Sequence, residues 1–407
     1  MKLNKIQLER VGPFGKLAME FPSCFPEDGA EVHIFTGPNG CGKSTLLYAL
    51  AAELGDKKLI RDRCWDGDSR FEITFNPPLP KAPLLPNEPN PPQQGYWTHG
   101  TPDDLRWSQA AFAYSGQRQL TSSPITAMKE LDRPPLEGSL AFRNVPDSSQ
   151  IFQWIANQRT KEALLRINHK NEMADRHARA ITRLNKAISQ IVDVDFRFIV
   201  EAEPLGVVVE VDGRKLGIDV LPDGLKSVIS WVADLLMRLE RVPWVNNDDL
   251  FQRRIILFLD EIDIHLHPKW QQKILPAVRR LFPNAQIFVS THSPFVVNSV
   301  ANAWVYGFGL ENGVSVLTSK NLTKTSSSLD LVLASVFEVE ETFGMETEKA
   351  LDGFYNMKLK VMADDSLRSD FLVLARNLAG ESLEIKDIVG RELLQLSRTT
   401  GREFSLS

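Results

Sequence analysis

The sequence predicts an α/β fold built around a parallel β-sheet. A short strand, EVHIFT at 31–36, runs directly into a glycine-rich turn and then into an apolar helix, the local order of a phosphate-binding loop. Two further runs, RIILFL at 254–259 and QIFVS at 286–290, are almost wholly apolar. Such runs are expected for strands that are buried on both faces of a parallel sheet.

The elements of the first half follow in order. Residues 2–11 alternate between apolar and polar side chains as in a strand, and a second short strand is expected at 17–21. After strand 31–36, the run LLYALAAELG predicts a helix that ends at Gly55. Residues 76–103 are rich in proline, which excludes a regular helix or a central strand and indicates a surface insertion.

The second half alternates between helical and strand patterns. Residues 150–192 have helical periodicity, and residues 196–220 predict strands with a tight Asp-Gly turn. The amphipathic run SVISWVADLLMRLE predicts a long helix before the apolar run at 254–259. From about Thr325 the pattern is helical to the end.

Composition excludes several classes of protein. Of 407 residues, 43% are hydrophobic and 24% are charged, as in a globular protein with a sizeable core. The net charge of -5 excludes a basic coat for nucleic acid over the whole surface, and three cysteines cannot form a closed disulfide framework. The N-terminal run is charged, and no apolar stretch is long enough for a membrane span. We therefore expect a cytoplasmic protein without a membrane partner.

The strongest motif is the run from Gly37 to Ser44, which matches G-x-x-x-x-G-K-[ST]. Its glycines let backbone N–H groups surround phosphate oxygens, while Lys43 reaches the β- and γ-phosphates and the Ser44 hydroxyl binds Mg²⁺. The N-terminus of the following helix adds partial positive charge. This context predicts a nucleotide site with ATP and Mg²⁺ as cofactors.

An acidic pair, Asp260-Glu261, follows the apolar strand at 255–259. An apolar strand that ends in two acids is the Walker B arrangement. Asp260 is expected to hold Mg²⁺ through water, and Glu261 is expected to polarise the attacking water.

Three segments together resemble one family: GPNGCGKST, LFLDEIDIHLHPKW and FVSTHSPFVV. They resemble the ABC-type ATPases of the RecF/SMC branch, and more narrowly its short, stand-alone bacterial AAA-15/AAA-21 members, such as the Septu, retron and PARIS-associated ATPases of anti-phage defence. The resemblance implies a P-loop NTPase with an ABC-type ATPase head, a helical insertion lobe and a helical C-terminal region. The implied regions are two parts of the head at 1–120 and 196–325, a helical lobe at 121–195 and a helical region at 326–407.

The resemblance also implies further site residues. His292 is the expected switch histidine that senses the γ-phosphate, and Gln117 the expected Q-loop glutamine near Mg²⁺ and the water, with Gln119 as the alternative. The segment 221–227 stands where the ABC signature belongs, although Pro222 and Asp223 depart from the usual Ser and Gly. The full expected nucleotide set is Gly37, Asn39, Gly40, Cys41, Gly42, Lys43, Ser44, Thr45, Asp223, Gly224, Lys226 and Ser227. The expected catalytic residues are Glu261, His292 and Gln117, and the expected Mg²⁺ residues are Ser44, Asp260 and Gln117.

The implied function is an ATP-hydrolysing molecular switch in which two chains sandwich two ATP molecules. Its relatives often work beside a separately encoded nuclease, so we expect self-association, a nuclease effector or nucleic acid as partners, and slow hydrolysis that depends on dimerisation. The alternatives are a RecF-like DNA repair ATPase and, less favoured, the ATPase subunit of an ABC transporter. A GTPase is disfavoured because no N-K-x-D motif follows the phosphate loop.

Three features leave alternatives open. His265 and His267, close to Asp260 and Asp263, could be metal ligands, but the resemblance places them in an interface segment. The eight Lys/Arg between Arg159 and Lys186 form either a solvated face or a surface for nucleic acid or an acidic partner. Prolines at every third position from Pro77 to Pro92 predict a polyproline II rod, or else an ordinary loop. The Asp193–Asp195 pair is not expected to be a nuclease centre.

Overall fold

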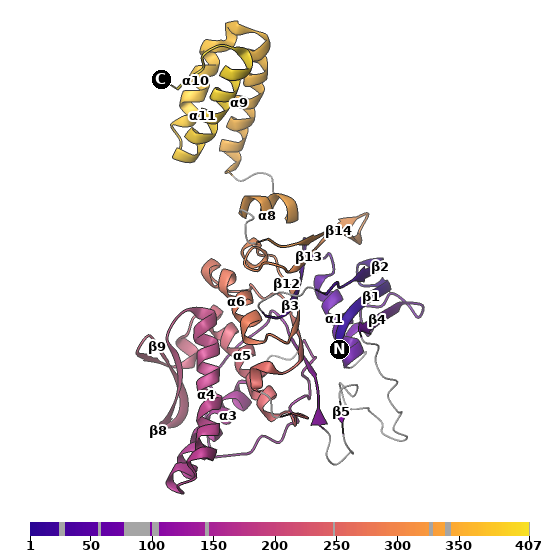
Figure 1. Ribbon diagram of the computed structural model, residues 1–407, viewed down its shortest axis with the longest axis vertical. Helices are drawn as coiled ribbons and strands as arrows, with labels where there is room; N and C mark the ends of the chain where they lie inside the picture. Colours follow the sequence, from indigo (N-terminus) through magenta and orange to yellow (C-terminus); the bar gives the residue numbers. More distant parts are fainter. Residues whose placement is uncertain are drawn as a thin grey trace. The chain divides into compact units, whose positions relative to one another are not determined.

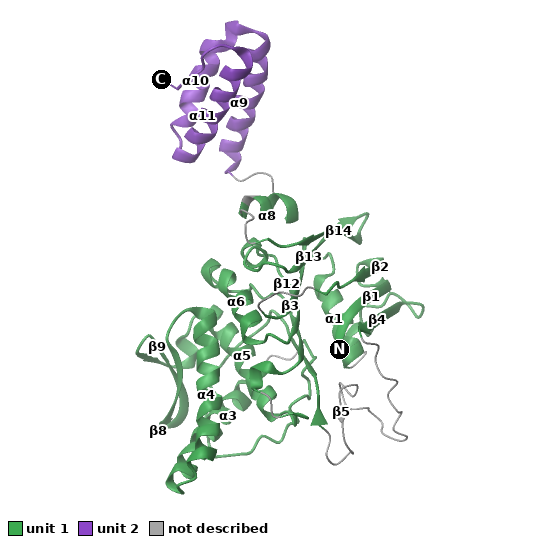
Figure 2. Cartoon of the chain, viewed as in Figure 1, with its two compact units in different colours: residues 1–337 green, residues 338–407 purple. Residues whose placement is uncertain are grey.

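The computed structural model describes residues 1–23, 29–55, 58–76, 98–99, 106–142, 146–246, 249–324, 329–337 and 343–406 (Figure 1). The chain divides into two compact units, residues 1–337 and 338–407, and each unit is described by itself (Figure 2). The proline-rich run at 77–97 lies outside the described residues, so the predicted rod stays a prediction.

The core of the first unit is a six-stranded sheet in the order β14-β13-β3-β12-β11-β7. Strands β3, β7, β11, β12 and β13 run parallel to one another, and β14 runs antiparallel to β13. All residues of β3, β7, β11 and β12 are buried, which agrees with the apolar runs that predicted a parallel sheet. The strands of this sheet are β3 (Glu31–Thr36), β7 (Ala110–Tyr114), β11 (Ile255–Leu259), β12 (Gln286–Ser290), β13 (Trp304–Glu311) and β14 (Val314–Leu322).

The described part of the first unit also contains three smaller antiparallel sheets. One contains β2-β1-β4, a second contains β10-β9-β8, and β5 pairs with β6. Strands β8 and β9 contact α3 and α4, so this hairpin lies on the helical lobe and outside the central sheet. The bounds are β1 (Lys2–Val11), β2 (Phe14–Glu20), β4 (Arg70–Asn76), β5 (Thr98–His99), β6 (Arg106–Trp107), β8 (Phe196–Ala202), β9 (Leu205–Val211) and β10 (Arg214–Leu216).

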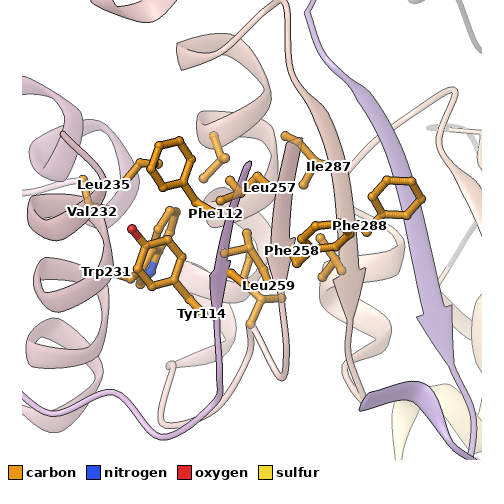
Figure 3. Packing of buried hydrophobic residues seen from close by; sticks show 14 of the residues in the cluster. Phe112, Tyr114, Trp231, Val232, Leu235, Leu257, Phe258, Leu259, Ile287 and Phe288 are labelled. Carbon is orange, nitrogen blue, oxygen red and sulfur yellow. The ribbon is translucent and has the colours of Figure 1, made fainter. Parts of the chain in front are cut away.

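Helices of the first unit pack on the central sheet and on one another. Figure 3 shows Trp231, Val232 and Leu235 of α5 beside Phe112 and Tyr114 of β7. The helices are α1 (Lys43–Leu54), α2 (Lys58–Arg61), α3 (Ser148–Ile167), α4 (Asn171–Val192), α5 (Asp223–Arg241), α6 (Pro268–Leu281), α7 (Pro294–Val297) and α8 (Leu329–Val336), with short 3-10 turns at 218–220 and 250–252. No helix among the described residues is long and apolar enough to cross a membrane.

One helical expectation needs correction. The pattern at 150–192 predicted continuous helix, but the structure has two helices, α3 and α4, with a turn at 168–170. His169 in this turn has a φ of 57°, which no helix interior accommodates. The basic run from Arg159 to Lys186 therefore lies on two helices that contact each other.

The second unit is a bundle of three helices with a core of its own. Phe354, Phe371 and Val389 are fully buried in this core. The helices are α9 (Met345–Ala363), α10 (Arg368–Ala379) and α11 (Leu383–Thr400), with a 3-10 turn at 365–367 between the first two.

Candidate nucleotide-binding site

Four loops that carry predicted site residues leave the same edge of the central sheet. Strands β3, β7, β11 and β12 are mutually parallel, so their carboxyl ends share one edge. The segments that follow them are 37–45, 115–119, 260–263 and 291–293. In open α/β sheets this edge is where ligands bind.

The loop before α1 requires glycine at two positions. Gly37 has a φ of 142°, and a Cβ there would lie 2.2 Å from the carbonyl oxygen of Phe308. Gly42 has a φ of 92°, and a Cβ there would lie 2.6 Å from the ring of Phe14. Helix α1 begins at the next residue, Lys43, so its free N–H groups face the loop. This is the backbone geometry of an anion site.

Lys43 lies inside the loop that precedes it. Its Nζ donates to the carbonyl oxygens of Gly37 and Pro38, both at 2.9 Å, and lies 3.7 Å from Sγ of Cys41. Asn39 and Gly40 are exposed at the tip of the loop, while Cys41 is buried. The ammonium group is therefore held among the backbone groups that would surround phosphate.

Oxygen donors from two motifs meet beside the loop. Ser44 Oγ donates to Oδ1 of Asp260 at 3.1 Å, and Ser290 Oγ donates to the same oxygen. A hydroxyl and one carboxylate are ligands that suit Mg²⁺, which in nucleotide sites takes its other ligands from phosphate and water. No group of three or more His, Cys, Asp or Glu in the described part of the chain could hold a metal ion. The Ser44 hydroxyl and the Asp260 carboxylate, which lie 3.1 Å apart, fit the Mg²⁺ of a nucleotide complex.

Glu261 has an unusual backbone and a shifted pKa. Its φ is 47°, and its N–H donates to Ser290 Oγ at 2.8 Å. Burial raises the pKa of Glu261, and the carboxylates of Asp260 and Asp263 raise it further, against the lowering effect of Lys43 and Arg118. A carboxylate with a raised pKa is a better proton acceptor for water.

Gly116 in the neighbouring loop leaves the space that Glu261 occupies. A Cβ at Gly116 would lie 2.5 Å from Oε2 and 2.9 Å from Cβ of Glu261.

His292 follows β12 at the same edge and is exposed. Desolvation lowers the pKa of His292 and the Lys43 ammonium lowers it further, while Asp263 and Asp260 oppose the shift. Next to it, Thr291 Oγ1 donates to Oδ1 of Asp263 at 2.6 Å, and Ser293 caps α7. The imidazole is therefore neutral near pH 7 and can donate or accept one hydrogen bond.

Gln117 and Gln119 are both exposed on the loop after β7. Ser115 Oγ donates to the Gln117 carbonyl at 3.4 Å, and Ser230 Oγ of α5 donates to the Gln119 carbonyl at 3.2 Å. The residue between them, Arg118, is buried and bonded to the Asp260 backbone. Sequence reasoning named the two glutamines and missed Arg118 and Ser290.

The segment 221–227 forms the N-terminus of α5. Pro222 is the N-cap and Asp223 is exposed, but Ser227 is only 1% exposed. A Cβ at Gly224 would lie 2.5 Å from the carbonyl oxygen of His265, and Lys226 Nζ donates to the Asp219 carbonyl at 2.7 Å. Of the residues named from sequence, Asp223 and Lys226 reach the surface, and the Ser227 hydroxyl does not.

The other polar clusters have structural contacts. His267 Nδ1 accepts from the Lys269 N–H at 3.3 Å and caps α6. Asp193 pairs with Lys273, and Asp195 pairs with Arg197 at 2.9 Å.

Comparison with known sequences gives a family match over more than half of the chain. The family described as "AAA domain, putative AbiEii toxin, Type IV TA system" matches residues 32–298, and a second family, described as "AAA domain", matches residues 1–54. The first match includes all four loops at the edge of the sheet.

Curated relatives include three bacterial proteins. The chain is 29% identical to the "Retron Ec83 probable ATPase" of Escherichia coli, over 52% of this chain and 38% of the relative. It is 30% identical to the "Retron Vc95 probable ATPase" of Vibrio cholerae, over 44% and 36%. It is 20% identical to the "Septu protein PtuA" of Bacillus thuringiensis, over 90% and 96%. The matched segments thus cover little more than a third of each retron protein.

Solved structures with a similar arrangement include heads of SMC proteins. The SMC head domain from Thermotoga maritima matches with a TM-score of 0.40 and 16% identity, over 80% of this chain and 100% of that chain. The SMC head bound to the C-winged helix domain of ScpA matches with a TM-score of 0.43 and 16% identity, over 79% and 98%. Similarity at this level supports no functional argument.

Proposed function

Because the chain belongs to the family described as "AAA domain, putative AbiEii toxin, Type IV TA system", we propose that it binds ATP with Mg²⁺ and hydrolyses it as a molecular switch in anti-phage defence. The observation that carries this proposal is the hydrogen bond of 3.1 Å between Ser44 and Asp260. It joins the phosphate loop to the acid pair after β11, which is the pairing that a Mg²⁺–ATP site needs.

Each residue of the site has a chemical task in this proposal. The N–H groups at the start of α1 and the Lys43 ammonium bind the β- and γ-phosphates. Ser44 and Asp260 hold Mg²⁺, which supplies charge compensation for the phosphates when bound. Glu261 accepts the proton of the attacking water, and His292 contacts the γ-phosphate. Gln117 orients the same water from the loop after β7.

Dimerisation is a further part of the proposal. The free N–H groups at the start of α5, which include that of Asp223, and the Lys226 ammonium would contact the γ-phosphate that a second copy binds. Hydrolysis would then be slow in the monomer and would increase with protein concentration. The buried position of Ser227 supports a role for the backbone in this contact in place of the serine hydroxyl.

The role in defence rests on the relatives. Septu and retron proteins are both among them, and the Septu protein aligns over nearly the full length of both chains. A separately encoded nuclease effector completes the proposal. A RecF-like repair role is the alternative, and the two differ in what co-purifies from the native operon, a nuclease or repair factors.

The first test compares Lys43→Ala and Glu261→Gln with the wild type. Lys43→Ala removes charge compensation for phosphate, so we expect ATP binding to weaken by about 100-fold or more. Glu261→Gln keeps the shape of the site, so we expect ATP affinity within about threefold of wild type and hydrolysis reduced by about 100-fold or more. Binding is measured by calorimetry and hydrolysis by phosphate release.

The same variants test the dimer. With ATP, Glu261→Gln should double its mass in light scattering, whereas Lys43→Ala should stay monomeric. Glu172→Gln, at an exposed position in the first turn of α4 and in none of the four loops, is the matched control and should behave as wild type. Hydrolysis by Glu261→Gln at the wild-type rate would exclude this residue as the base.

A further inference from the structure

Arg118 is a buried arginine directly beneath the acid pair. It lies in the loop after β7 and is only 4% exposed. Its Nη2 donates to the carbonyl oxygen of Asp260 at 2.8 Å, and its Nε donates to the carbonyl oxygen of Ser115 at 2.5 Å. One guanidinium group therefore bonds the backbone of the loop after β7 to the backbone after β11.

The carbonyl that Arg118 binds belongs to the peptide bond that joins Asp260 to Glu261. The N–H of the same peptide bond donates to Ser290 Oγ at 2.8 Å. Both polar groups of this peptide are thus bonded, and its plane is held from two sides. The N–Cα bond of Glu261 starts in this plane, so the orientation of the plane together with φ sets the direction of the Glu261 side chain.

Glu261 needs such support. Its φ of 47° lies in the left-handed region, which non-glycine residues adopt rarely and at a cost in energy. A conformation of this kind persists where surrounding contacts enforce it. Arg118 and Ser290 are the described side chains that bond to this peptide.

Arg118 also contacts α5, the helix that begins at the segment 221–227. Its guanidinium carbon lies 5.9 Å from the centre of the Trp231 ring. On either side of this contact, Ser230 Oγ donates to the Gln119 carbonyl at 3.2 Å, and the Tyr114 hydroxyl donates to Asp234 at 2.9 Å. Strand β7 and the loop that holds Arg118 therefore contact α5 at Ser230, Trp231 and Asp234.

The geometry requires an arginine. Two N–H groups of the planar guanidinium bind the carbonyl oxygens of Ser115 and Asp260, and the ammonium group of a lysine reproduces this geometry poorly. Burial lowers the pKa of Arg118 to about 10, against the opposing effect of Asp260, Asp263 and Glu261, so the group stays charged at neutral pH. The charge is retained in a site that would otherwise favour an apolar side chain.

We propose that Arg118 is a positioning residue for ATP hydrolysis, which aims Glu261 at the attacking water by fixing the Asp260–Glu261 peptide and links this peptide to α5. The proposal rests on the proposed ATPase function. It predicts that loss of the guanidinium fork reduces turnover and leaves ATP binding unchanged, because Arg118 donates to the carbonyl oxygens of Ser115 and Asp260, which lie outside the phosphate loop.

The test compares Arg118→Lys with Arg241→Lys. Arg241 is a matched control because its guanidinium, like that of Arg118, donates to two backbone carbonyls; its Nη2 lies 2.9 Å from that of Leu131 and 2.6 Å from that of Arg133. We expect Arg118→Lys to lower kcat by about 10- to 100-fold with the Kd for ATP within about twofold of wild type. Arg241→Lys should change neither value, and thermal unfolding verifies that both variants are folded.

A second measurement does not depend on hydrolysis. The amide of Glu261 should exchange hydrogen about tenfold faster in Arg118→Lys than in Arg241→Lys, because the Asp260–Glu261 peptide loses one of its anchors. If Arg118→Lys does not fold, Trp231→Phe is tested in its place, because this change weakens the contact between the guanidinium and the ring. We expect it to lower kcat several-fold and to leave the Kd for ATP unchanged.

Three outcomes would overturn the proposal: unchanged kcat in the Arg118 or Trp231 variant, a Kd that rises in parallel with the loss of kcat, or unchanged exchange at the Glu261 amide. Failure of the ATPase function itself would look different. If the wild-type chain neither binds nor hydrolyses ATP, the proposed ATPase function is refuted, and with it the role of Arg118 in hydrolysis. The exchange measurement would still decide whether Arg118 fixes the Asp260–Glu261 peptide.

Discussion

His33 lies on β3, between β13 and β12 in the central sheet, and is fully buried. Its Nε2 is 2.9 Å from Oε1 of Glu31, its Nδ1 is 3.3 Å from the hydroxyl of Tyr306, and its ring stacks on Phe288. Burial lowers the pKa of His33, although the bond to Glu31 opposes the shift. The folded protein therefore holds this imidazole neutral at pH values where the unfolded chain is protonated.

The lowered pKa of His33 predicts a pH-dependent stability. The unfolded state binds a proton near pH 6.5 and the folded state does so only at lower pH. Stability is therefore complete above about pH 6.5 and falls as the pH drops below it, by up to about 1.4 kcal/mol per pH unit for one proton. Urea unfolding between pH 5.5 and 7.5 measures this slope.

His33→Gln should reduce the slope, and the exposed His267→Asn should leave it unchanged, since Asn can still cap α6. An equal slope in wild type and His33→Gln would assign the dependence to other groups.

Some candidate site residues are easier to name from the sequence than others. Lys43, Ser44, Asp260 and Glu261 lie in short continuous motifs, so their residue types and order suffice to name them. Arg118 is different, because its bond to the Asp260 carbonyl joins residues that are 142 positions apart. The only local signal was a charged residue after an apolar strand, and that signal is common on protein surfaces.

At the scale of elements, buried parallel strands were the most predictable. The apolar runs at 255–259 and 286–290 became β11 and β12, since a strand that is covered on both faces leaves no polar alternation. The turn between α3 and α4 was not predicted, because it contains neither Gly nor Pro. Asn168 ends α3 instead, and its Nδ2 donates to the Leu164 carbonyl at 2.8 Å.

Helix α4 carries a basic stripe, which consists of Arg176, Arg179, Arg183 and Lys186. Their spacing of 3-4-3 places them on one face over about 15 Å. Arg183 pairs with Asp249, whereas Arg176, Arg179 and Lys186 are exposed and make no ion pair among the described residues. These three side chains are therefore available to phosphate groups of nucleic acid.

We predict that replacing Arg176, Arg179 and Lys186 by Gln weakens nucleic-acid binding. Each lost phosphate contact should reduce the slope of log K against log salt by about 0.9, so the triple variant should lose up to about 3 in slope. Fluorescence anisotropy with a 20-bp duplex, at about 50 to 200 mM salt, measures this.

The matched control for the basic stripe removes the same charge from the second unit, at the exposed Lys349, Lys360 and Arg398. It should bind the duplex as wild type does. Equal binding by both triple variants and the wild type would mean that the basic stripe is a solvated face.

At the scale of the whole molecule, the chain contains two separate hydrophobic cores. The larger one belongs to residues 1–337 and includes the central sheet, and the smaller one lies among α9, α10 and α11. Helical periodicity predicted the helices of the second unit. Periodicity identifies the apolar face of each helix but does not show which other element that face packs against. It therefore could not predict that the second unit has a core of its own.

Separate cores predict separate unfolding. In the smaller core, Phe371 is fully buried, stacks on Phe354 at 5.0 Å between ring centres and contacts the edge of Phe404 at 6.1 Å. Phe371→Ala should therefore destabilise the second unit by about 3 to 5 kcal/mol. Calorimetry should show that one transition moves to lower temperature while the other stays in place, and ATP affinity should not change.

Leu394→Ala on α11 is the control, because Leu394 is 59% exposed and its loss should cost less than about 0.5 kcal/mol. A parallel shift of both transitions in Phe371→Ala would show that the two cores unfold as one cooperative structure.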